Sequence, residues 1–156
     1  MKILMVCLGN ICRSAMAEGI LRDKAEERGA EIEVDSAGTG NYHIGEAPDR
    51  RAIDLMAKKG HDISHMKARQ FEVKDFDRFD RIYAMDTSNY NNIMALARND
   101  SDKAKVNLAL NVTHPGENLE VADPYFGGAE GFVEVYEQLD HVSEVIVNEV
   151  LSSNED

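Results

Sequence analysis

Short apolar runs and longer amphipathic stretches alternate along the chain. The apolar runs predict strands at four places, residues 2–7, 31–36, 79–85 and 105–110. The amphipathic stretches predict helices at 15–28, 49–59, 87–98 and 129–151, where apolar side chains recur at steps of three or four residues. The chain therefore reads as regular alternation of strand and helix.

This alternation predicts an α/β fold, in which a four-stranded parallel sheet carries helices on both faces. The chain contains no internal repeat, low-complexity segment or linker, so we expect one domain over residues 1–152 with a frayed tail at 153–156. Ligands of such sheets bind beyond the carboxyl ends of the strands. The loop that follows the first strand is therefore the first place to look for a site.

Composition excludes several classes of partner. The chain has 156 residues, with 17 basic against 29 acidic side chains and a net charge of −12. Nucleic acids and anionic membranes favour Lys- and Arg-rich surfaces, so neither is an expected partner. No window is long and apolar enough to span a membrane, and the first apolar run is too short for a signal peptide. With only two cysteines, we expect a cytoplasmic protein with reduced thiols.

The loop from Cys7 to Ser14, C-L-G-N-I-C-R-S, joins the first strand to a helix start. Unpaired N–H groups and the helix dipole make such a junction an anion-binding nest. Gly9 and Asn10 are the positions expected to take positive φ. Arg13 offers a planar fork for two phosphate oxygens. The loop is not a Walker P-loop, because it lacks the Gly-Lys-Ser/Thr ending.

Cys7 at the base of this nest would be held as a thiolate by the N–H groups, the dipole and Arg13. Ser14 can donate its hydroxyl to the sulfur, which helps when the sulfur must leave. The pattern predicts attack of Cys7 on a phosphoryl group with no cofactor and no metal. The alternative is a buried structural cysteine beside an ordinary helix cap. A zinc site at His61 and His65 is disfavoured, since no further ligands complete it.

The stretch Val6 to Glu18, VCLGNICRSAMAE, resembles the signature of the low-molecular-weight protein tyrosine phosphatases. The likeness continues through residues 35–39, 68–70, 79–86 and Asp123-Pro124-Tyr125-Phe126, in the family's order. It implies a phosphatase I type of flavodoxin-like, Rossmann-like fold. It also implies hydrolysis of phosphotyrosine in two steps through a cysteinyl phosphate. Catalysis then falls to Cys7, Arg13 and Asp123, the last as general acid and base.

The resemblance assigns supporting roles to other residues. Asn10, Ser14 and Ser36 match positions that keep the phosphate loop rigid, and Asp86 matches an acidic residue that orients Arg13 or caps the next helix. The usual loop His is replaced by Met66, with His65 one place earlier. Tyr42 and Tyr125 match aromatic walls of the substrate pocket, while Phe126 lacks a second hydroxyl. The implied phosphate-binding set is Leu8, Gly9, Asn10, Ile11, Cys12, Ser14 and Ser36.

Alternatives within the same fold remain open at this point. A phosphoarginine phosphatase tends to have Thr where this chain has Ile11. An arsenate reductase needs further cysteines beyond Cys12, and a non-catalytic binding module would lack Cys7 or Asp123. Cys12 either protects Cys7 by a reversible disulfide or is a small buried hydrophobe. The implied partners are a phosphotyrosine-containing protein and a cognate tyrosine kinase.

Overall fold

The computed structural model describes residues 1–154, and they build a four-stranded parallel sheet with strand order β2-β1-β3-β4. The strands are β1 (Lys2–Cys7), β2 (Glu33–Gly38), β3 (Arg81–Ala84) and β4 (Val106–Leu108). The predicted fold class and all four strands are confirmed. The β2 strand begins at Glu33, two residues later than predicted, where it pairs with Lys2 at the start of β1.

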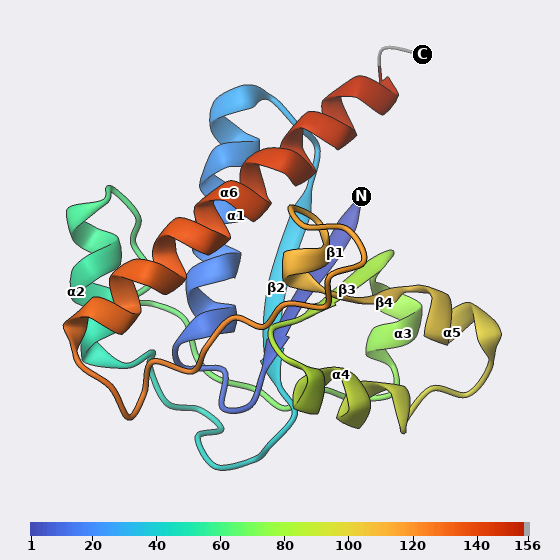
Figure 1. Ribbon diagram of the computed structural model, residues 1–156, viewed down its shortest axis with the longest axis horizontal. Helices are drawn as coiled ribbons and strands as arrows, with labels where there is room; N and C mark the ends of the chain where they lie inside the picture. The colour runs from blue at the N-terminus through green and yellow to red at the C-terminus, as the bar shows by residue number, and fades with distance from the viewer. Residues whose placement is uncertain (155–156) are drawn as a thin grey trace.

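The helices cover both faces of the sheet (Figure 1). Those with bounds close to the predicted ones are α1 (Arg13–Arg28), α2 (Arg50–Lys58), α4 (Thr87–Met94) and α6 (Ala129–Asn154). The alternation of side chains along β1 separates two cores. Ile3 and Met5 pack toward α1 and α6, whereas Leu4 and Val6 pack with residues of β3, β4 and α4.

Three local differences from the sequence prediction have physical causes. Asn99 accepts a hydrogen bond from the N–H of Asp102, so the predicted 87–98 helix is followed by a separate α5 (Asp100–Ala104). A short α3 (Asp75–Arg78) and a 3₁₀ turn (Ala109–Asn111) were not predicted. The α6 helix extends beyond the predicted end at Leu151 to Asn154, and residues 155–156 of the predicted tail lie outside the described residues.

The packing of α1 between the sheet and α6 fixes the site. The α1 helix ends at Gly29, whose φ of 69° provides a left-handed cap. In Figure 1 the long α6 crosses α1 obliquely, and the orange segment that leads into it runs from the centre of the picture to the lower left. The strands end together, with Cys7 paired to Gly38. Within residues 1–154, no helix has the length and apolar character needed to cross a membrane.

Candidate active site

The loop between β1 and α1 is a tight turn over the helix N-terminus. Asn10 adopts a left-handed conformation with φ of 59°, as expected, but Gly9 is not among the residues with positive φ. The prediction that Gly9 takes a positive φ is therefore wrong. A Cβ at Gly9 would lie 3.0 Å from Cδ2 of His43, so a larger residue there would require the His43 ring to shift.

The Cys7 sulfur is buried at the base of this loop. The backbone N–H of Asn10 donates to Sγ across 3.3 Å, and the Ser14 hydroxyl oxygen lies 3.0 Å from Sγ. Only 3% of Cys7 is exposed, and Ser14 is fully buried. The sulfur thus has two neighbouring polar groups that can donate to it, which is the environment that stabilises negative charge on sulfur.

Asn10 links the loop to three other parts of the fold. Its Nδ2 donates to the Ser14 and Ser36 hydroxyls at 2.8 and 2.9 Å, and its Oδ1 accepts from the Arg69 backbone N–H at 3.0 Å. Ser36 in turn donates to the buried Glu18 carboxylate at 2.6 Å. Every hydrogen-bonding atom of the Asn10 amide is therefore used within the protein, and the loop has little freedom to move.

Arg13 is almost fully buried beside Cys7, in the first turn of α1. Its Nη1 donates to Oδ2 of Asp86 at 2.7 Å and to the Val121 carbonyl at 2.9 Å. Burial alone would lower the pKa of Arg13, but the nearby Cys7 and Asp86 outweigh burial and raise it. Oδ1 of Asp86 accepts from the N–H of Asn89, so both predicted roles of Asp86 occur together.

Asp123 approaches from the segment before α6. Its Oδ2 lies 3.7 Å from Nη2 of Arg13, while its Oδ1 accepts from the Tyr125 backbone N–H at 3.0 Å. The Asp123 side chain is 37% exposed, in contrast to the buried Arg13. One guanidinium therefore lies close to both the loop cysteine and this carboxylate.

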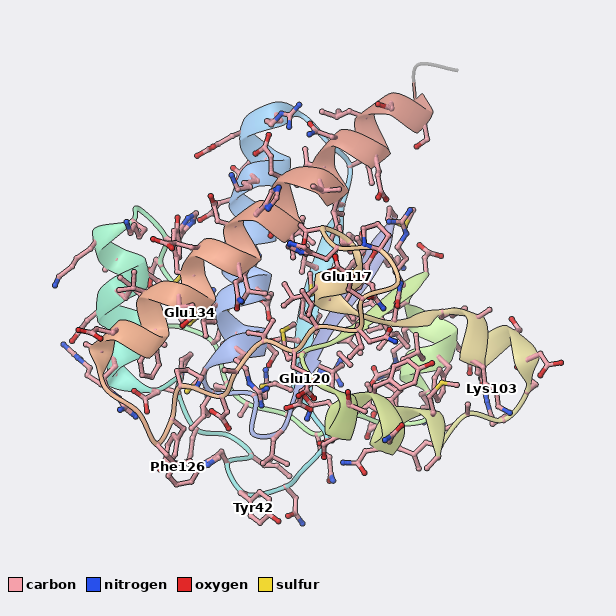
Figure 2. The ribbon with its side chains drawn as sticks, viewed as in Figure 1. Tyr42, Lys103, Glu117, Glu120, Phe126 and Glu134 are labelled. Atoms are coloured by element: carbon pink, nitrogen blue, oxygen red, sulfur yellow. The ribbon has the colours of Figure 1, made fainter. Side chains whose placement is uncertain are left out.

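These groups share one cavity of about 440 Å³. Its floor includes Cys7 and Arg13, and its walls include Ile11, Tyr42, His43, Asp123, Tyr125 and Phe126. Tyr42 is 72% and Phe126 91% exposed, and Figure 2 places both at the lower edge of the molecule, near the ends of β1 and β2. The mouth of the cavity is therefore aromatic, and its base is polar.

Cys12 lies at the N-cap of α1 and is buried in the same loop. Burial is the main cause that raises the pKa of its thiol to about 12, with the negative charges of Asp49, Cys7 and Asp123 adding to it. Cys12 is therefore a neutral thiol at ordinary pH.

The comparisons with known proteins agree over nearly the whole chain. The sequence profile of the family described as low molecular weight phosphotyrosine protein phosphatase matches residues 2–155. The chain belongs to this family. The low molecular weight phosphotyrosine protein phosphatase of Schizosaccharomyces pombe is 44% identical over 141 residues, covering 88% of this chain and 89% of that protein. As a member of this family, the protein is a phosphatase.

Solved structures of similar proteins have the same fold. A protein tyrosine phosphatase of Entamoeba histolytica superposes with a TM-score of 0.91 at 32% identity, covering 99% of each chain. A Drosophila arginine phosphatase superposes with a TM-score of 0.88 at 33% identity, covering 96% of this chain and 97% of that one. The fold thus accommodates two kinds of phosphatase, and residues of the cavity must distinguish them.

Within this phosphatase, the structure also brings in residues that sequence reasoning missed. Glu18 and Arg69 support the loop. His43 lines the cavity, and Arg51 bonds the segment after Asp123. Glu18 lies close to the loop in sequence, but its partner Ser36 is 18 residues away, so the bond between them could not be predicted. His65 is exposed, and the bond to Oδ1 of Asn10 comes from the Arg69 backbone instead. Across residues 1–154, no three His, Cys, Asp or Glu side chains are grouped to hold a metal ion.

Proposed function

We propose that this phosphatase hydrolyses phosphotyrosine in proteins through a covalent phosphate ester of Cys7. The observation that carries the proposal is the shared cavity, which is lined by Cys7, Arg13 and Asp123. A nucleophile, a cation for the phosphate and a proton donor are the three groups that phosphate ester hydrolysis without a metal requires.

In the first step, the thiolate of Cys7 attacks phosphorus, and the bond from phosphorus to the phenolic oxygen breaks. Protonated Asp123 gives its proton to that oxygen, so tyrosine leaves as the neutral phenol. Arg13 and the N–H groups of the loop hold the phosphate oxygens, where negative charge is concentrated. Because Asp86 and Val121 already hold Nη1 of Arg13, its remaining donors are oriented before substrate arrives.

In the second step, a water molecule attacks the thiophosphate while ionised Asp123 takes its proton. The sulfur–phosphorus bond breaks, which releases inorganic phosphate and restores the thiolate. Ser14, 3.0 Å from Sγ, donates its hydroxyl to the departing sulfur. Asn10, Ser36 and Glu18 act on this chemistry only by keeping the loop in place.

The walls of the cavity favour an aryl phosphate. Tyr42 and Tyr125 flank the mouth, and a flat ring between them gains stacking and apolar contact that a short phosphoserine would not. Ile11 contributes an apolar wall, which is a poor environment for the cationic guanidinium of phosphoarginine. The substrates are therefore phosphotyrosine proteins, and a cognate tyrosine kinase is the enzyme class that would supply them.

Two variants test the proposal against aryl phosphates. Cys7→Ser removes the nucleophile and is expected to abolish turnover while inorganic phosphate still binds. Asp123→Asn keeps the shape but cannot give a proton, so turnover should fall on the order of a hundredfold or more. Asp100→Asn on the exposed start of α5 is the matched control and should match the wild type. Full activity of Cys7→Ser would overturn the covalent step.

A further inference from the structure

Arg51 in the first turn of α2 bonds the backbone of the segment that carries Asp123. Its Nη2 donates to the Tyr125 carbonyl at 2.8 Å, and its Nη1 donates to the Gly127 carbonyl at 3.1 Å. In the described part of the chain, no other side chain outside residues 122–128 donates to a backbone carbonyl of that segment. The two bonds therefore attach the segment to α2 just after Asp123.

The Nε and Nη2 edge of the Arg51 guanidinium is held by Asp49. Nε and Nη2 of Arg51 each lie 3.1 Å from a carboxylate oxygen of Asp49, which also caps α2. The hydrogen bonds from Arg51 lower the pKa of Asp49, so this pair stays charged over the working pH range. The Asp49 backbone N–H donates to the Ile11 carbonyl at 2.8 Å. Arg51 is thereby connected to the phosphate loop through one residue.

The face of the guanidinium is packed on aromatic rings. Cζ of Arg51 lies 4.7 Å from the centroid of Phe132 and 5.8 Å from that of Tyr125. Phe132, in the first turn of α6, is 1% exposed and cannot swing away without opening the core. Aromatic contact and four in-plane hydrogen bonds together fix both the position and the tilt of the guanidinium.

The segment that carries Asp123 is thus attached on both sides of the carboxylate. Before Asp123, the Val121 N–H donates to the Met85 carbonyl at 2.8 Å, and the Val121 carbonyl accepts from Arg13. After Asp123, the segment is attached through the bonds from Arg51 to the Tyr125 and Gly127 carbonyls. Asp123 itself lies 3.7 Å from Arg13, beyond hydrogen-bond distance, so that contact alone does not fix the carboxylate.

We propose that Arg51 is a positioning residue that sets the distance of the Asp123 carboxyl from the leaving oxygen. The proposal rests on the proposed role of Asp123 as the proton donor. A lysine at this position has no planar fork, so it cannot bond Asp49 and two carbonyls at once. Loss of Arg51 therefore misplaces the proton donor while the phosphate loop keeps its own hydrogen bonds.

The test compares two substrates that differ in their need for a proton. The nitrophenolate of p-nitrophenyl phosphate leaves with little help, whereas the phenolate of phenyl phosphate depends on the acid. In Arg51→Ala, kcat/KM for phenyl phosphate is expected to fall about tenfold, and for p-nitrophenyl phosphate about twofold or less. Arg51→Lys should lie between Arg51→Ala and the wild type. The inhibition constant of inorganic phosphate should be unchanged, because the cradle remains intact.

The matched control is Arg50→Ala on the same turn. The Arg50 side chain is 83% exposed and pairs with Asp54 within α2, so its loss should leave the ratio of the two substrates at the wild-type value. Arg51→Ala is also made in the Asp123→Asn background. Once the proton donor is absent, the loss of Arg51 should not change the substrate ratio further.

The outcomes separate this inference from the proposed function. If Asp123→Asn does not change the substrate ratio, Asp123 is not the acid and the role of Arg51 fails with it. If Asp123→Asn changes the ratio but Arg51→Ala and Arg51→Lys do not, only the positioning role is wrong. Equal losses on both substrates, or weakened phosphate binding in both Arg51 variants, would mean that Arg51 supports the fold in general and would also overturn the inference.

Discussion

The amide nitrogen of Asn10 lies 2.9 Å from the hydroxyl oxygen of Ser36, a residue 26 positions later in the chain. This hydrogen bond connects the loop around Cys7 to the neighbouring strand β2, where Ser36 pairs with Met5. The loop is therefore held by side-chain bonds that cross between elements and not by its own turn geometry alone. Removal of the Asn10 side chain should therefore weaken the loop, and the loss should appear in the free energy of unfolding and in kcat/KM.

Asn10→Ala is expected to lower both stability and activity. The variant loses three side-chain hydrogen bonds and places alanine, which tolerates the left-handed region less well than asparagine, at a φ of 59°. The free energy of unfolding should fall by about 2 kcal/mol or more, and kcat/KM should fall with it. Urea unfolding and steady-state kinetics measure the two effects.

Asn118 provides the control for backbone strain. It has a φ of 55° and lies on an exposed loop away from the cavity, where its Oδ1 accepts one exposed hydrogen bond from Nδ2 of Asn111. Asn118→Ala should cost stability of a similar order from strain, about 1 kcal/mol, and leave kcat/KM unchanged. If both variants lost activity equally, the loop hydrogen bonds would not be what matters at Asn10.

Asp86 variants separate the orientation of Arg13 from helix capping. Asp86→Asn has a single side-chain oxygen, so it can cap α4 or accept from Arg13 but cannot do both. With the cap kept, stability should be nearly unchanged, and kcat/KM should fall a few-fold because an amide NH2 then faces Arg13. Asp86→Ala loses both functions, so it should cost about 1 kcal/mol in the unfolding free energy and at least about tenfold in kcat/KM. Thermal unfolding and kinetics of the two variants give the comparison, and identical kinetics would contradict it.

The two cysteines should differ in their reaction with alkylating agents. Because the pKa of Cys12 is raised to about 12, its thiolate is scarce below that pH and forms only as the pH rises toward it. Iodoacetate between pH 6 and 9 should therefore label native protein once, at Cys7, as mass spectrometry of the digested protein would detect. Labelling of Cys12 in native Cys7→Ser at these pH values would show that Cys12 is reactive.

The net charge of −12 predicts selectivity between phosphopeptides. A single phosphate is attracted locally by Arg13 and the loop, but acidic residues around it experience repulsion from the whole protein. Phosphotyrosine peptides with basic or neutral flanks should have higher kcat/KM than acidic ones at low salt, and the difference should shrink as salt screens the field. Equal values at low salt would remove net charge as a determinant.

The sheet, the loop from Cys7 to Ser14 and the family could be inferred from local signals in the sequence. The strands predicted at 2–7 and 79–85 are short runs rich in apolar residues, and the loop motif is contiguous from Cys7 to Ser14. Both signals are local, so they can be read along the chain. The predicted helix over 87–98 runs past its actual end at Met94, and Asn99 caps the separate α5.

The distant residues that complete the site depend on the fold. Ser36 and Asp86 reach the loop because the parallel strands β2 and β3 end at the same edge as β1. Arg69 and Asp123 lie in connecting segments, which the bonds from Gly38 N–H to the Arg69 carbonyl and from Val121 N–H to the Met85 carbonyl hold at that edge. Arg51 meets the carbonyls of Tyr125 and Gly127 because α2 and α6 pack beside the same loop. The sequence has Met66 where the family has a loop His, with His65 one place earlier, but the bond to Asn10 comes from the backbone N–H of Arg69. Backbone donors are common to every residue except proline, so the sequence could not indicate which one would point at the loop.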